Sequence, residues 1–265
     1  NRDTSEMYPR RDVEIGAPVM SVKNLTVDGA FEDISFDIRS GEILGLTGLL
    51  GSGDKEVLNT LFGQIKPDAG EIILHDKTQK FSSPVDAVNS GVAKIPEDRR
   101  AHGVATGLSV GENMSLASLG QMSTRGFVDR KKEAAVIDGL IKELGIKTPD
   151  RHTLVKNLSG GNQQKVVVGK WLSCNSEIYL LDEPTVAVDV GAKVEIYNLM
   201  NRLASEGKGL VFVSSDLEEV TEMCDRVLVI YRGRIIAEYK RGEIDADRLL
   251  AAASGAVSET ERKRA

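Results

Sequence analysis

An apolar run that ends in two carboxylates limits the possible folds of this chain more than any other feature. Residues 178–181 read Ile-Tyr-Leu-Leu, and Asp182 and Glu183 follow them directly. A short apolar run of this kind is typical of a strand buried inside a parallel sheet. Such a strand has no structural need for two acidic groups at its end. The pair suits phosphoryl chemistry, in which Asp182 holds Mg²⁺ through water and Glu183 orients the attacking water.

A glycine-containing segment lies upstream of that strand. Residues 158–165 read Leu-Ser-Gly-Gly-Asn-Gln-Gln-Lys, and two adjacent glycines let the backbone come close to a ligand. We expect a helix to begin at about Asn162, so that its free N–H groups face an anion, to which Ser159 can donate its hydroxyl. A polar loop that merely caps a helix would explain Ser-Gly-Gly alone, but not its combination with the acidic strand end. The candidate ligand-binding residues of this segment are Leu158, Ser159, Gly160, Gly161, Asn162 and Gln163.

Apolar strands alternate with helices along most of the chain. This order predicts an α/β fold with a mostly parallel sheet that helices cover on both faces. A chain of 265 residues with 41% hydrophobic content can bury a full core, as one large domain or two small ones. Strands are expected near residues 19–27, 34–38, 43–46, 70–74, 178–182, 209–213, 226–230 and 234–237. Helices are expected near 54–62, near 129–145 with Asp129 as its cap, from about 162 onward, and near 194–203 and 217–224.

Composition narrows the functional classes. The net charge of −6, with no dominant basic stretch, argues against a general nucleic-acid-binding protein. Cys174 and Cys224 lie in apolar surroundings, so we interpret them as buried thiols and not as a disulfide or a metal pair. No apolar run approaches the roughly 20 residues that cross a bilayer, so a role at a membrane requires a partner.

The two segments, in this order and at this separation, resemble the signature motif and the Walker B strand of ATP-binding-cassette ATPases. The resemblance covers about residues 19–242. It implies a P-loop NTPase fold with a RecA-like core, an antiparallel β-subdomain and a helical subdomain near residues 98–157. It also implies ATP and Mg²⁺ as cofactors. We therefore expect a linker at residues 1–18, a nucleotide-binding domain at 19–242 and a C-terminal tail at 243–265.

The Asn-Gln-Gln-Lys ending of the signature segment points to a narrower group. It resembles the ATP-binding subunits of bacterial monosaccharide importers of the ribose, galactose and xylose type. Residues 96–100, 109–113 and 188–193 resemble the same subunits. The last of these segments contains Asp189, a candidate nucleotide-binding residue. Those subunits carry two cassettes in one polypeptide, and the second resembles this chain, which we expect to be part of a longer protein. The implied partners are the N-terminal cassette, a transmembrane sugar permease and, indirectly, a periplasmic sugar-binding protein. The implied location is the cytoplasmic face of the bacterial inner membrane.

The P-loop region departs from the family pattern G-x-x-x-x-G-K-[ST]. Asp54 stands in the place of the lysine, and Lys55 in the place of the serine or threonine. A carboxylate ~4 Å from a phosphate costs about 1–4 kcal/mol per pair of unit charges, so nucleotide affinity should fall by orders of magnitude. A one-residue shift that lets Lys55 replace the lysine is the alternative, and an acid such as Asp54 also stabilises the start of a helix. The loop residues assigned to nucleotide binding are Gly48, Gly51, Ser52, Gly53, Asp54, Lys55 and Glu56.

Other positions also depart from the pattern. Ser215, a candidate catalytic residue beside Glu183, stands where the family has its switch histidine, and Pro96 stands where it has the Q-loop glutamine. No aromatic residue near residues 27–28 is available to stack on adenine, and we interpret Phe31 as core. Family cassettes pair head to tail, so that ATP lies between the P-loop of one and the signature motif of the other. The resemblance thus implies that the chain's own nucleotide site is degenerate and that its signature motif serves the partner cassette. Glu183 belongs to the degenerate site, where it is either a remnant or supports slow turnover.

Two other functions remain open. One is a fully active stand-alone ATPase of a non-transport type, against which the acidic balance, the importer-like segments and Asp54 all argue. The other is a purely structural half that never meets nucleotide, against which the intact signature segment argues, although ancestry alone could explain that segment. Tight ATP binding by the isolated chain would favour the first, and loss of transport on changing Ser159 would exclude the second.

Overall fold

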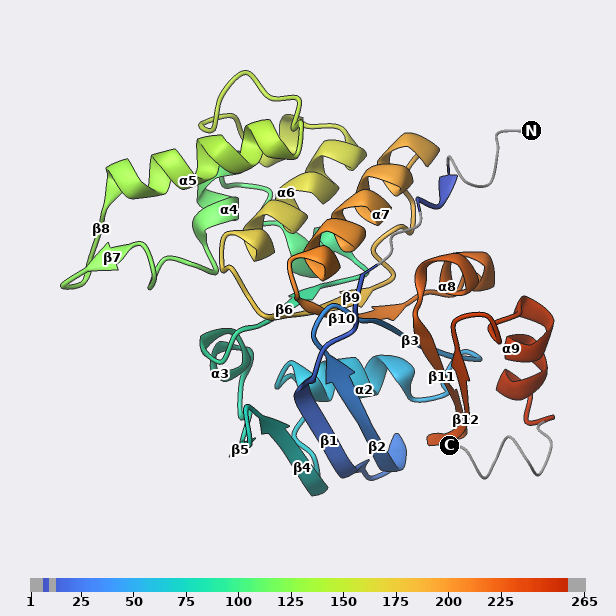
Figure 1. The fold of residues 1–265 in the computed structure, drawn as a ribbon. Coiled ribbons are helices and arrows are strands. Elements are labelled where there is room, and N and C mark those ends of the chain that lie inside the picture. Colours follow the sequence, from blue (N-terminus) through green and yellow to red (C-terminus); the bar gives the residue numbers. More distant parts are fainter. Residues whose placement is uncertain (1–6, 10–12, 257–265) are drawn as a thin grey trace.

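The computed structural model describes residues 7–9 and 13–256, and its centre is a six-stranded sheet (Figure 1). The strand order is β12-β11-β3-β10-β9-β6, and only β12, at one edge, runs antiparallel to its neighbour. Every residue of β9 and β10 is buried, which explains why these strands are continuous apolar runs in the sequence. The strands are β3 (Ile43–Gly48), β6 (Val92–Ile95), β9 (Ile178–Asp182), β10 (Gly209–Val213), β11 (Arg226–Tyr231) and β12 (Arg234–Lys240).

Helices cover this sheet on both sides. Figure 1 shows α6 and α7 on one side of the sheet and α2 on the other. Helix α7 packs against β10, α6 against β6, and α2 against β3 and β9, while α8 and α9 pack against β3. The bounds are α2 (Asp54–Leu61), α3 (Pro84–Asn89), α6 (Gly160–Leu172), α7 (Val190–Ser205), α8 (Leu217–Met223) and α9 (Ala246–Ala253).

A smaller antiparallel sheet has the strand order β2-β1-β4-β5. Buried and exposed residues alternate along much of β2, as expected for a sheet with one covered face. Strand β2 also contacts β10 and β12, so the two sheets are packed together. The bounds are β1 (Pro18–Val27), β2 (Phe31–Arg39), β4 (Ala69–Leu74) and β5 (Lys77–Gln79).

Residues 98–157, expected to be helical, contain helices and one short hairpin. Helix α4 (Val110–Ser115) and helix α5 (Arg130–Glu143) both pack against α6. Asp129 caps α5 as the sequence predicts, because its carboxylate accepts the N–H groups of Lys131 and Lys132 at 3.0 Å each. A π-helix covers residues 99–103, a 3-10 turn covers 155–157, and the hairpin of β7 (Ser123–Thr124) and β8 (Phe127–Val128) is not evident from the sequence.

Parts of the expected linker and of the expected tail fall within the described residues. The expected linker and tail lie partly outside the described residues, at 1–6, 10–12 and 257–265. Within the described part, Tyr8 is buried, and its ring centroid lies 5.3 Å from that of Tyr197. Helix α9 lies inside the predicted tail. It packs on the core because Leu249, Ala252 and Ala253 form a buried apolar face. No helix within the described ranges is long and apolar enough to cross a membrane.

Candidate functional site

The predicted residues converge at one edge of the six-stranded sheet. Strands β3, β6, β9 and β10 run parallel, so their carboxyl ends meet at the same edge. In open α/β sheets this edge is where ligands bind. The structure thereby brings together predicted residues from segments that are far apart in the chain, namely the loop 48–56, Pro96, Asp182, Glu183 and Ser215.

The loop 48–56 keeps the backbone shape of a phosphate cradle. Gly53 has φ 107° and precedes the first residue of α2 without any side-chain cap. A Cβ added at Gly53 would lie 2.9 Å from the carbonyl oxygen of Ala30, and one added at Gly48 would lie 2.5 Å from that of Ile230. Only glycine fits such positions, and the first turn of α2 is left with N–H groups that face the loop.

Asp54 places a carboxylate within this cradle. Its Oδ1 accepts a hydrogen bond of 3.1 Å from the buried hydroxyl of Ser52. Burial raises the pKa of the Asp54 carboxyl, although hydrogen bonds from the Lys55 N–H and the Ser52 hydroxyl oppose the shift. The loop therefore places a carboxylate in the first turn of α2, at the position where the family pattern has its lysine.

Lys55 is paired with another residue of the same edge. Its Nζ lies 2.7 Å from Oε2 of Glu97, and both side chains are partly exposed. Burial lowers the pKa of Lys55, but the bond to Glu97 outweighs this effect and the pKa is raised. Ion pairs exposed to this degree contribute at most about 1 kcal/mol, so the pair orients Lys55 toward Glu97 without locking it there.

Asp182 faces a lysine that sequence reasoning did not select. Oδ2 of Asp182 lies 3.2 Å from Nζ of Lys94, and both side chains are almost completely buried. Burial lowers the pKa of Lys94, and the nearby Asp182 opposes this shift. The available signal was a charged residue inside β6, a four-residue strand that is otherwise apolar. Buried lysines are rare and nearly always paired.

These residues do not fit a resident Mg²⁺ ion. P-loop ATPases hold the metal between the serine or threonine of the loop and the Walker B aspartate. Here Lys55 replaces the hydroxyl residue, and an ammonium group lies beside Asp182.

Glu183 and Ser215, the two candidate catalytic residues, contact each other. Oε1 of Glu183 accepts the backbone N–H of Ser215 at 2.8 Å, and Oε2 accepts the Ser215 hydroxyl at 3.2 Å. Glu183 is buried, with φ 46°, and burial raises its pKa against the lowering effect of both bonds. Both carboxylate oxygens are thus engaged within the chain. Nearby, Phe31 is 3% exposed, which confirms its interpretation as core.

The signature segment differs from the loop 48–56 because no acidic residue lies in the first turn of its helix. Helix α6 begins at Gly160, two residues before the expected Asn162, and Ser159 occupies the N-cap position. Ser159 is exposed, and its hydroxyl oxygen accepts the Asn162 amide at 2.9 Å instead of a helix N–H group. The first turn of α6 therefore has no side-chain cap and can receive an anion from outside.

Asp189 lies close to this helix end. It caps α7 by accepting the N–H of Ala192 at 3.0 Å. A Cβ added at Gly161 would be 3.6 Å from Oδ2 of Asp189, so the two predicted residues are neighbours. Gln164 joins the same region to the end of β9, because its side-chain amide donates to the carbonyl oxygen of Pro184 at 2.9 Å.

Sequence reasoning also missed the buried carboxylate of Glu219. It accepts hydrogen bonds from Thr185 at 2.6 Å, from Ser214 at 2.9 Å and from the ammonium of Lys193 at 2.6 Å. Burial raises the pKa of Glu219, but these donors outweigh burial and the pKa is lowered. Glu219 therefore positions the segments that follow β9 and β10, including the one that carries Ser215.

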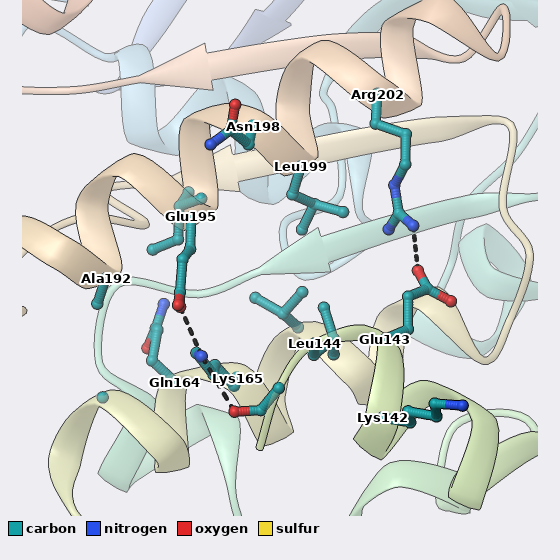
Figure 2. A pocket seen from close by; sticks show the side chains of 14 residues that line it. Lys142, Glu143, Leu144, Gln164, Lys165, Ala192, Glu195, Asn198, Leu199 and Arg202 are labelled. Carbon is teal, nitrogen blue, oxygen red and sulfur yellow. Dashed lines mark hydrogen bonds and ion pairs between the residues drawn. The ribbon is translucent and has the colours of Figure 1, made fainter. Parts of the chain in front are cut away.

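A separate cavity of about 370 Å³ lies between the end of α5, α6 and α7 (Figure 2). Two ion pairs cross it, from Lys165 to Glu195 at 2.6 Å and from Arg202 to Glu143. Lys165 also donates to the carbonyl oxygen of Gly145 at 3.3 Å. These contacts tie α7, which packs on the central sheet, to the helical region that carries the signature segment.

The sequence of this chain is similar to those of known transporter proteins. Residues 31–186 match the family model described as "ABC transporter". The chain is 57% identical over 255 residues to the ribose import ATP-binding protein RbsA of Cereibacter sphaeroides, covering 96% of this chain and 51% of that protein. It is 48% identical to the protein of the same name from Pseudomonas putida, covering 97% and 50%. The chain thus spans about half the length of these relatives.

Solved structures show the same fold. A nucleotide-free ATP-binding cassette from an ABC transporter aligns with a TM-score of 0.73 at 18% identity, covering 92% of this chain and 97% of that one. A dimeric post-hydrolysis state of a cassette bound to ADP and phosphate aligns with a TM-score of 0.71 at 23% identity, covering 84% and 98%. At these identities the likeness concerns the fold alone.

Proposed function

The chain belongs to the ABC transporter family, and from this premise we propose that it is the second ATP-binding cassette of a bacterial monosaccharide importer. The names of its relatives support a sugar of the ribose type. In this proposal residues 19–242 form the cassette, residues 1–18 connect it to a first cassette, and residues 243–265 add α9 to its surface. The isolated chain hydrolyses ATP weakly or not at all.

The observation that carries the proposal is the contrast between the two anion sites. The loop 48–56 contains the carboxylate of Asp54, whereas the first turn of α6 has neither a side-chain cap nor a charge of its own. A helix end of this kind stabilises a phosphate that another chain segment delivers. The chain therefore lends its signature segment to ATP held by the partner cassette.

The residues of the signature segment would bind and orient that ATP. The Ser159 hydroxyl and the N–H groups of Gly160 and Gly161 contact its terminal phosphate, while Leu158, Asn162 and Gln163 hold the turn in shape. ATP supplies the phosphoryl group, and the partner cassette supplies the attacking water. Asp189, next to Gly161, stabilises the joint between the two cassettes.

The proposal includes a location and partners for the whole subunit. The subunit binds the cytoplasmic side of a transmembrane sugar permease, which receives sugar from a periplasmic binding protein. Closure of the two cassettes on ATP moves the permease between its states. The permease contact is the segment 96–113, where Arg99 and Arg100 begin the π-helix after the sheet edge.

A paired substitution in the full-length two-cassette subunit tests the proposal. ATP hydrolysis and sugar uptake are measured with the subunit and its permease in proteoliposomes. Ser159→Ala should lower both by at least tenfold, because it removes a donor to the terminal phosphate at the working site. Ser215→Ala is the matched control, an exposed serine at the degenerate site, and it should change both by less than threefold. The opposite ranking of the two variants would refute the proposal.

A further inference from the structure

Lys94 is a charge buried at the centre of the sheet edge. It lies on β6, its residue is 5% exposed, and it pairs in register with Leu180 of β9, close to the end of that strand. A lysine in such surroundings loses most of its hydration, so its position must be stabilised by other groups. None of the sequence motifs described above includes it.

The ammonium group of Lys94 is fully engaged. It has three N–H donors and three acceptors, which are Oδ2 of Asp182 at 3.2 Å, Oε1 of Gln64 at 3.2 Å and Oδ1 of Asn59. Asn59 lies on α2 and Gln64 shortly after it, so Lys94 bridges the helix of the loop 48–56 to the acidic end of β9. Its charge is therefore fixed beside Asp182.

The positive charge of Lys94 opposes the binding of a divalent ion at Asp182. The second oxygen, Oδ1, is buried and has no hydrogen-bond partner within the described part of the chain, so it is the atom that a metal or its water would approach. A metal there would lie next to the ammonium of Lys94, with little water between them to weaken the repulsion. The charge of Lys55 also acts on Asp182, and the hydroxyl ligand of the loop is missing.

We propose that Lys94 replaces the metal ion at Asp182 as an internal counter-ion, so that the nucleotide site of this chain does not take Mg²⁺. The inference rests on the proposed assignment of residues 48–56 as the chain's own nucleotide loop. A nucleotide that reaches this edge binds without any contribution from a protein-held metal. The partner cassette's site, which uses Ser159, is unaffected.

The test restores the loop and then removes the counter-ion. Binding of a fluorescent methylanthraniloyl ATP is measured with Mg²⁺ and with EDTA, for the 265-residue chain carrying Asp54→Lys and Lys55→Thr. Its Kd should change by less than threefold between the two conditions. Adding Lys94→Gln, which keeps a polar donor but removes the charge, should make Mg²⁺ tighten binding by tenfold or more. Adding Lys23→Gln instead, on the exposed part of β1, should leave Mg²⁺ dependence unchanged.

Two outcomes would overturn the inference. One is a tenfold Mg²⁺ effect while Lys94 is still present, and the other is no Mg²⁺ effect after Lys94→Gln. If the restored loop fails to bind nucleotide, thermal unfolding of variants of the native chain tests the pairing of Lys94 with Asp182. Lys94→Gln and Asp182→Asn should each lower Tm, and the double variant should lower Tm by less than their sum, whereas additive shifts would overturn the pairing. Failure here leaves the Ser159 result intact, so the inference and the proposed function are tested separately.

Discussion

Replacing Asp54 by Lys and Lys55 by Thr should convert the loop 48–56 into a nucleotide site. At ~4 Å, a pair of unit charges interacts by about 1 kcal/mol in water and about 4 kcal/mol near a protein surface. Asp54→Lys exchanges a repulsive carboxylate–phosphate pair for an attractive ammonium–phosphate pair, so it strengthens binding by about two such pair energies. Lys55→Thr offsets less than one pair, because Glu97 already neutralises Lys55 at 2.7 Å. The Kd for ATP should therefore fall by at least about tenfold.

Calorimetric titration of both chains with ATP and Mg²⁺ measures this change. The matched control is Asp247→Lys, because Asp247 is also an acid in the first turn of a helix, α9, and its side chain is exposed. The control should leave ATP affinity within about twofold of native. Micromolar binding and hydrolysis of ATP by the native chain would refute the reasoning. It would mean that Lys55 replaces the missing lysine and that the subunit has two working sites.

Further predictions concern stability and the permease contact. Glu219→Gln should lower the free energy of unfolding by about 1–3 kcal/mol in urea titrations, because it removes the charge of a buried carboxylate that accepts hydrogen bonds from the partly exposed Lys193 and two hydroxyls; an unchanged free energy of unfolding would contradict this. The pKa of Glu219 is lowered on folding, so the stabilisation that its carboxylate provides is present above the unfolded-state pKa and disappears as pH falls through the folded-state pKa. The free energies of unfolding of the native chain and of the Glu219→Gln variant should therefore converge in acid. Gly53→Ala should cost about 1–3 kcal/mol and clearly more than Gly51→Ala, because a Cβ at Gly51 meets nothing within 4 Å; equal losses would exclude the steric explanation. Charge reversal of Arg99 and Arg100 should abolish sugar uptake by the full importer, and unchanged uptake would remove segment 96–113 as the permease contact.

The fold class was predictable because its signals are local. The apolar strands β9 and β10 and the cap at Asp129 each depend on a few neighbouring residues, and the structure confirms them. Helix α9 was missed because its apolar face is only eight residues long and lies in a polar end of the chain. The start of α6 was predicted two residues too late, because the low helix propensity of two glycines at its first turn suggested a loop.

The partners of the site residues could not be predicted, because they come from distant segments. The sequence shows a lysine at position 94, but its meaning depends on β6 lying beside β9, which places it next to Asp182. The pairing of Lys55 with Glu97 and the cluster around Glu219 depend on the same long-range order. Motifs locate candidate residues, whereas the three-dimensional arrangement decides whether those residues are free to bind a ligand.

That distinction supports the proposed contrast between the sheet edge that carries the loop 48–56 and the first turn of α6. A group contributes to binding only by the difference between its contacts with the ligand and those it must give up. Asp54, Lys55, Asp182 and Glu183 each have a partner within the chain, so a nucleotide would first have to displace those partners. The N–H groups in the first turn of α6, after Ser159, have no side-chain cap to give up. Under the proposed function, the chain therefore binds its own nucleotide weakly and completes the site of the partner cassette through the first turn of α6.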